Sequence, residues 1–363
     1  MTAGESLSCW LRLTLIPGIG GETQRKLLSA FGLPEAIFSA SRSELLSVIS
    51  DKSASLILDT SNSDLVDTAC KWSEAPDQHI ITLADPEYPR SLLEIPDPPT
   101  ILYVRGRSEL LNRQALAIVG SRNPTPQGVQ NAERFATAFS ESGLLIASGL
   151  ALGIDAAAHR GALEVNGDTV AFIGTGIDRI YPARNKELAI EIAEKGAIVS
   201  EFPIGTPVTA ANFPRRNRLI SGFSLGVLVV EAAIESGSLI TARLAGEQGR
   251  EVFAIPGSIH SPQSRGCHKL IKQGAKLVET AQDVLEELRW NTNHPENTVP
   301  DHPVSFQSVN LLSAMGFDPC GLDDLALRSG LTADTLSVTL LQLELEGHVA
   351  SLPGGRYQQL VGP

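Results

Sequence analysis

An alternation of short apolar runs with longer helical stretches, between residues 114 and 290, constrains this chain more than any other feature of its sequence. Short continuous apolar runs are typical of strands whose two faces are both covered by helices. The pattern therefore predicts an α/β fold in which a Rossmann-like, doubly wound sheet forms the main domain. The predicted strands are Leu116–Val119, Leu144–Ala147, Val170–Ile173, Ala197–Ser200, Gly226–Val230, Val252–Ile255 and Lys276–Val278. The clearest predicted helices are Val129–Glu141, Asp155–Glu164, Lys186–Lys195 and Ser238–Gln248.

The residues before this domain predict a small all-helical domain, residues 1–75, and a proline-rich extension, residues 76–113. In the helical part, two predicted helices, Leu7–Leu15 and Glu22–Phe31, flank a glycine-containing turn, as in a helix-hairpin-helix. Such glycines either let a phosphate approach the backbone or only close a tight helical hairpin, and the sequence leaves both readings open. The extension has one clear strand signal, Ile101–Val104, and we expect it to pack on the main domain as a connector.

Two further segments follow the main domain. Residues 291–305 are polar, contain prolines and lack periodicity, which predicts a linker. Residues 306–363 predict a winged-helix-like domain, in which a helix-turn-helix precedes a two-stranded wing. The helices are predicted at Leu322–Ser329 and Thr332–Glu346, and the strands at His348–Leu352 and Tyr357–Val361.

The charge of the chain is unevenly distributed. The net charge is −12, yet residues 211–276 carry nine lysines and arginines against four acidic residues. Local charge matters for binding because exposed charges are screened beyond about 8 Å at physiological salt. The basic segment therefore keeps nucleic acid among the partners of a chain whose overall charge disfavours it.

Nothing in the sequence indicates a membrane or an export route. No apolar run approaches the roughly 18 residues of a membrane-spanning helix, and the N-terminal residues lack the features of a secretory signal. The four cysteines are scattered without a C-x-x-C pair, which predicts reduced thiols. We therefore expect a cytoplasmic protein with no membrane partner.

Small and polar residues follow four of the predicted strands, at the sheet edge where folds of this kind bind their ligands. Such loops can aim backbone N–H groups and helix N-termini at phosphates, which predicts an extended phosphate-bearing ligand. The dinucleotide fingerprint G-x-G-x-x-G and the P-loop are absent, so we predict no nucleotide cofactor. The candidate binding residues in these loops are Gly120, Ser121, Arg122, Thr125, Gly149, Gly153, Gly237 and Ser238. The loop after the third predicted strand contains two further glycines, Gly174 and Gly176.

The densest basic motif combines guanidinium groups, which bind phosphates, with a ring that can stack on a base. Its candidate binding residues are Phe213, Arg215, Arg216, Asn217 and Arg218. Because Arg215 and Arg218 are three residues apart on one helical face, we expect them to join Arg122 at the ligand, while the third arginine braces the fold. The adjacent Cys267 and His268 do not form a metal site by themselves, and we predict no metal.

Five segments together resemble the DNA-processing protein A (DprA/Smf) family: Ala115–Gly128, Ser148–Leu163, Phe213–Ser221, Glu231–Leu244 and Gly249–Val278. The resemblance is dense over residues 80–290 and looser in the flanking domains. It implies a homodimeric, non-enzymatic recombination mediator that binds single-stranded DNA during natural transformation. Such a protein protects DNA entering a competent cell from nucleases and helps to load the RecA recombinase onto it. The resemblance also implies that the Gly120–Arg122 loop and the Phe213–Arg218 segment form the DNA pocket.

The sequence also contains features of two other functional classes. A phosphoribohydrolase-type N-glycosidase acting on nucleotides needs a glutamate beside a Pro-Gly-Gly-x-Gly-Thr loop, and the chain has Glu231 and Glu235 without that loop. These glutamates can instead buttress the loop or cap a helix. A winged-helix transcription factor needs cations on the helix that enters the DNA groove, and Thr332–Glu346 contains no lysine or arginine. We therefore expect the C-terminal domain to be dispensable for DNA binding and to act as a partner-binding or regulatory module.

Overall fold

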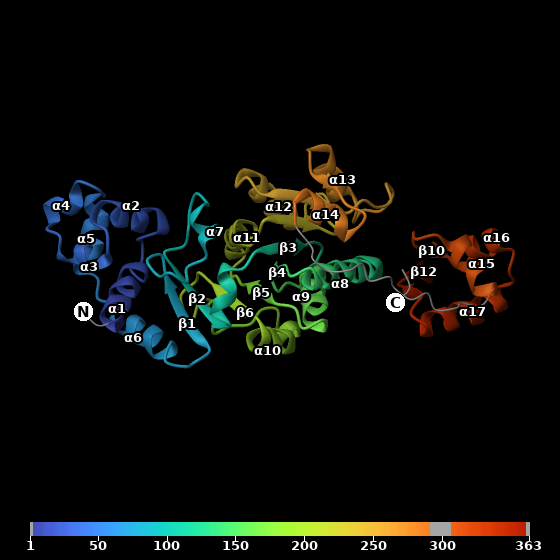
Figure 1. Cartoon of the computed structure of the whole chain (residues 1–363), viewed down its shortest axis with the longest axis horizontal. Helices are drawn as coiled ribbons and strands as arrows, with labels where there is room; N and C mark the ends of the chain where they lie inside the picture. The colour runs from blue at the N-terminus through green and yellow to red at the C-terminus, as the bar shows by residue number, and fades with distance from the viewer. Residues whose placement is uncertain (1–2, 291–305, 361–363) are drawn as a thin grey trace.

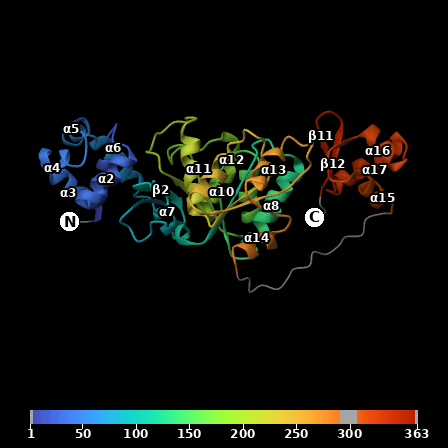
Figure 2. The same cartoon turned by 90° about the horizontal axis from the view of Figure 1, so that it is seen from above.

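The computed structural model describes residues 3–290 and 306–360, so the predicted linker lies outside the described residues. A helical domain lies at one end of the molecule, a sheet domain in the middle and a small C-terminal domain at the other end (Figure 1). The view from above shows the same order (Figure 2). The predicted fold class is confirmed.

The central domain is built on a nine-stranded sheet of order β1-β2-β6-β5-β4-β3-β7-β8-β9. The seven strands from β3 to β9 are mutually parallel, whereas β1 and β2 pair antiparallel at one edge. The strands are β1 (Gln78–Thr82), β2 (Ile101–Gly106), β3 (Ala115–Val119), β4 (Leu145–Ser148), β5 (Thr169–Phe172), β6 (Ala197–Ser200), β7 (Gly226–Val229), β8 (Glu251–Ala254) and β9 (Lys276–Leu277).

The proline-rich segment differs from its sequence interpretation. Only one strand was predicted there, but the structure contains both β1 and β2, and both are strands of the main sheet. The prolines that obscured the pattern, such as Pro96 and Pro99, lie between the two strands. The segment therefore extends the sheet through backbone hydrogen bonds, and it is not a connector laid against the sheet.

Helices cover both faces of the sheet, and alternate residues of each strand supply the two cores. One core lies under α7 (Arg90–Leu93), α11 (Asn212–Phe223), α12 (Ser238–Glu247) and α13 (Arg265–Lys272). The opposite face packs on α8 (Pro126–Glu141), α9 (Ile154–Glu164), α10 (Lys186–Lys195) and α14 (Ala281–Glu287). Because every residue of β3 to β7 is buried, each of these strands is a continuous apolar run rather than an alternating one.

The N-terminal domain packs directly on the sheet domain. It comprises α1 (Ala3–Thr14), α2 (Gly21–Phe31), α3 (Pro34–Ser39), α4 (Arg42–Leu46), α5 (Asp51–Asp59) and α6 (Ser63–Trp72). Trp10 and Leu11 of α1 share a buried core with Tyr103 of β2. Near the glycine turn, the Arg25 guanidinium donates to the Pro98 carbonyl at 3.2 Å and Lys26 pairs with Glu22 at 2.8 Å. These contacts favour the second reading of the turn, as a tight helical hairpin.

The C-terminal domain has its own buried core, to which Leu325, Leu340 and Val349 contribute. Its elements are α15 (Phe306–Met315), β10 (Cys320–Gly321), α16 (Leu322–Ser329), α17 (Ala333–Leu345), β11 (Val349–Leu352) and β12 (Arg356–Gln359). The predicted helix-turn-helix and wing are present. The structure adds α15 and the short strand β10, which pairs with β12 to complete a three-stranded sheet.

Candidate nucleic-acid interface

A cleft of about 780 Å³ opens at the carboxyl ends of β3 and β7. These two neighbouring strands mark the point where the strand order reverses, since β4 to β6 lie on one side and β8 and β9 on the other. Loops leaving the sheet there diverge and create a crevice, which is where doubly wound folds place their ligands. The β3–α8 loop, the start of α11, the start of α12 and the β5–α10 loop line this cleft.

Three side chains that contact one another form one wall of the cleft. The Arg122 guanidinium carbon lies 5.5 Å from the centroid of the Phe213 ring. On the same ring, Tyr181 makes a tilted aromatic contact with a centroid separation of 5.8 Å. The wall thus combines one exposed cation with two rings, which suits a ligand that carries both phosphates and bases.

Backbone hydrogen bonds hold the β3–α8 loop against the segments that follow β4 and β7. The Ser121 N–H donates to the Glu231 carbonyl at 2.7 Å, and the Ser121 carbonyl accepts from the Ile154 N–H at 3.1 Å. Gly153 has a φ of +80°, and a β-carbon there would lie 2.3 Å from the Ser121 oxygen. Glycine is therefore required at this position by both conformation and space. Gly120 and Ser121 line the cleft, whereas Gly153 lies behind it and fixes the loop.

Arg216 lies at the floor of the cleft and is only 4 % exposed. Its Nη1 donates to the Phe172 carbonyl at 2.6 Å. Asp155 is also buried and accepts from the Gly149 N–H at 3.2 Å. A β-carbon on Gly149 would overlap both Arg216 and Asp155, so the missing side chain lets the two charges approach. Burial lowers the pKa of Arg216 to about 10 and raises the pKa of Asp155, and the attraction between the two groups opposes both shifts.

The expectation that Arg218 shares the ligand-facing side with Arg215 is wrong. Arg218 is buried, forms an ion pair with the buried Glu201 and donates to the Asp97 carbonyl at 2.6 Å. It ties α11 to the β1–β2 segment, a contact that helical periodicity within α11 cannot reveal. Arg215 remains 55 % exposed and also pairs with Glu201, at 3.1 Å, but it lies beside the cleft rather than in its lining.

Thr125 stabilises the start of α8 and does not line the cleft. It is the N-cap of α8, where its hydroxyl accepts from the Gly128 N–H at 3.0 Å and donates to Glu231 at 2.6 Å. Its backbone N–H donates to the other Glu231 oxygen at 2.9 Å. Both oxygens of this carboxylate are therefore engaged in holding the β3–α8 loop against the end of β7.

Three more predicted residues line the cleft on its α12 side: Asn217, Gly237 and Ser238. The Asn217 amide donates to the Gly237 carbonyl at 3.4 Å, which connects α11 to the start of α12. The structure also adds lining residues that the sequence interpretation missed: Tyr181, Asn123, Asp155 and Gln263. Tyr181 could have been predicted from the sequence, because it follows Gly174 and Gly176 in the same loop. Asp155 could not have been predicted as a lining residue, since an acidic residue in the first turn of a helix is common.

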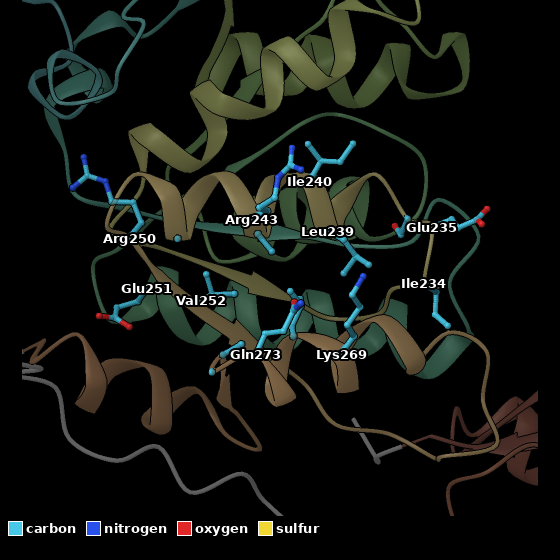
Figure 3. A pocket seen from close by; sticks show the side chains of 16 residues that line it. Ile234, Glu235, Leu239, Ile240, Arg243, Arg250, Glu251, Val252, Lys269 and Gln273 are labelled. Carbon is cyan, nitrogen blue, oxygen red and sulfur yellow. The ribbon is translucent and has the colours of Figure 1, made fainter.

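A second cavity of about 610 Å³ lies between α12 and α13, beside β8 (Figure 3). Leu239 and Val252 contribute apolar surface to it, while Arg243 and Lys269 place cations there. Glu235, Ser236 and Ile240 line both this cavity and the cleft, so the start of α12 separates the two.

Among residues 3–290 and 306–360, no helix has the length and hydropathy needed to cross a lipid bilayer.

Comparison with known proteins places these features in a family. The family model described as DNA recombination-mediator protein A matches residues 79–289. A DprA winged helix domain matches residues 295–355, and a SAM-like helix-hairpin-helix tandem matches residues 11–61.

Individual proteins agree with the family models. The chain is 45 % identical to protein Smf of Escherichia coli over 298 residues, which is 80 % of each chain. The crystal structure of DNA processing protein A from Streptococcus pneumoniae has a TM-score of 0.68 at 36 % identity, covering 79 % of this chain and 98 % of that one. A structure that describes the single-stranded DNA binding mode of the Helicobacter pylori protein has a TM-score of 0.53 at 32 % identity, covering 58 % and 96 %.

Proposed function

Because the chain belongs to the DprA/Smf family of DNA-processing proteins, we propose that it binds single-stranded DNA in the cleft at the ends of β3 and β7. The observation that carries the proposal is the wall formed by Arg122 and Phe213. A guanidinium group neutralises a phosphate and a neighbouring ring stacks on any base, a combination that tolerates every sequence. The related Helicobacter pylori protein, whose structure describes single-stranded DNA binding, supports the proposal.

A salt-dependent titration of the full chain with single-stranded and double-stranded oligonucleotides tests this function. We expect the single strand to bind more tightly, since bases in a duplex are paired and cannot stack on Phe213. The affinity should fall as salt rises, because phosphate contacts release counterions. Equal affinity for both forms, or no binding to the single strand, would contradict the proposal.

We further propose that the protein acts without catalysis in the cytoplasm, protecting incoming single-stranded DNA from nucleases and helping to load RecA during natural transformation. The position of Glu231 supports a non-catalytic role, because both of its carboxylate oxygens are engaged by Thr125. Incubation with nucleoside monophosphates followed by an assay for free base tests the alternative. Release of base would favour an N-glycosidase, in which Glu235 is the exposed carboxylate of the cleft.

The winged-helix domain is expected to be dispensable for DNA binding. Its helix α17 contains no lysine or arginine, and instead exposes Val338, Leu341 and Leu345 along one face. Truncation after Trp290 should therefore change the affinity for single-stranded DNA by less than tenfold. The cut keeps Trp290, whose indole N–H donates to the Ser142 carbonyl at 2.9 Å and whose ring packs on the sheet domain. A larger loss in a truncated protein that still unfolds cooperatively would contradict this prediction.

We propose a homodimer and place its contact on the α12–α13 face. Ile234 is 52 % exposed, and it lines the second cavity together with Leu239 and Ile240 (Figure 3). The apolar residues Val284 and Leu285 of α14 are buried in the sheet domain and are not available for such a contact. Light scattering at micromolar concentration should give the dimer mass, and Ile234→Asp should shift the protein toward the monomer. A monomer mass for the unmodified chain would exclude the proposal.

A further inference from the structure

Tyr181 is a large aromatic residue that the packing of the protein does not use. Its side chain is 44 % exposed, and it belongs to none of the buried cores of the described residues. It lines the cleft and contacts the Phe213 ring at a centroid separation of 5.8 Å, with 40° between the ring planes. A base sandwiched between two rings needs about 7 Å, twice the optimal separation of stacked carbon atoms. The two rings therefore cannot share one base, and together they offer adjoining surface for two.

We infer that residues 178–185 of the β5–α10 loop extend the single-stranded DNA site, with Tyr181 stacking the base that neighbours the one on Phe213. This inference rests on the proposed function and adds a second base position to it. It makes the site a track that begins at Arg122 and Phe213 and continues over Tyr181.

The loop holds Tyr181 in place before any ligand binds. On its N-terminal side, the Thr175 hydroxyl donates to the Arg179 carbonyl at 2.7 Å, and Asp178 accepts from the Gly205 N–H at 2.8 Å. On its C-terminal side, the Asn185 amide donates to the Leu150 and Ala151 carbonyls at 2.9 and 3.1 Å. Because both ends are anchored to neighbouring loops, binding orders little additional chain, and preorganisation of this kind increases affinity.

The same loop also carries two exposed arginines. Arg184 lies three residues after Tyr181, in the short 3₁₀ turn Ala183–Asn185, where it is exposed and forms no ion pair with any described residue. Arg179 is also exposed and has only a 3.7 Å pair with Asp178, which is weak at a solvated surface. We expect Arg184 to contact the phosphate that follows the second stacked base.

Fluorescence anisotropy of a labelled oligothymidylate with the full chain tests the track. Tyr181→Ala should weaken binding about fivefold, the lower end of what one stacked base contributes, without changing the slope of log affinity against log salt. Tyr181→Phe keeps the ring and should bind as the unmodified protein does. Arg184→Ala should reduce that slope by about 0.7, whereas Arg160→Ala, an exposed arginine on α9 that pairs with Glu133, should leave it unchanged.

The outcomes separate this inference from the proposed function. If Phe213→Ala weakens binding and Tyr181→Ala does not, the second base position is wrong while the cleft remains the DNA site. If Tyr181→Phe loses as much affinity as Tyr181→Ala, the hydroxyl and not the ring makes the contact, and stacking is excluded. If the unmodified chain binds no single-stranded DNA, the proposed function itself fails.

Discussion

Replacing Arg216 by methionine should lower the free energy of unfolding of the sheet domain by about 3–5 kcal/mol, because it removes the cation that lies next to the buried Asp155 carboxylate. Arg216 and Asp155 approach each other across Gly149, and both are buried beneath the cleft. The substitution also removes the donor to the Phe172 carbonyl, which is left unpaired in the interior. Urea denaturation followed by circular dichroism measures the change.

The adjacent arginine provides a matched control for this experiment. Arg215→Met should cost less than about 1 kcal/mol, since Arg215 is exposed and the buried Glu201 keeps its pair with Arg218. If both variants unfold at the same urea concentration, Arg216 does not carry the structural role that its burial indicates. If Arg216→Met is the less stable variant, any loss of DNA binding at a temperature where it is partly unfolded reflects lower stability and not a lost DNA contact.

Phe213→Ala should weaken the binding of single-stranded DNA by about 1–3 kcal/mol while leaving the salt dependence unchanged, because a ring contributes stacking and no charge. Arg122→Ala should instead reduce the slope of log affinity against log salt by about 0.7, the contribution of one phosphate contact on a single strand. The sequence alone suggested three such arginines, but the burial of Arg218 and the position of Arg215 beside the cleft leave Arg122 as the principal one. Anisotropy titrations at several salt concentrations distinguish the two effects.

Phe317→Ala is the matched control for the ring, since Phe317 is exposed in the C-terminal domain, away from the cleft. It should bind DNA as the unmodified chain does. An unchanged affinity for both Phe213→Ala and Arg122→Ala would move the DNA site away from the cleft. The N-terminal hairpin around Gly18 would then be the next candidate, although Arg25 and Lys26 are already engaged there.

The sheet of this protein could be predicted because its strands are buried on both faces. That burial makes the central parallel strands β3 to β7 continuous apolar runs. All seven predicted runs overlap the strands β3 to β9, although β9 at the sheet edge is exposed. The edge strand β1 (Gln78–Thr82) was missed for the converse reason: only its last two residues are fully buried, so its pattern is weak. Prolines between β1 and β2 then made a strand pair look like a connector.

The cleft also has features that the sequence predicts and features that only the tertiary structure reveals. The sequence by itself determined which loops reach the ligand-binding edge, because the carboxyl ends of parallel strands lie together, and it thereby brought Arg122, Phe213 and Ser238 to one cleft. Only the tertiary structure decided what each arginine of α11 contacts. Arg216 lies under β5 and Arg218 against Glu201 and Asp97, partners that are far away in the sequence. Periodicity fixes which residues share a helical face, but the elements packed around the helix decide whether that face meets solvent, a buried carboxylate or a ligand.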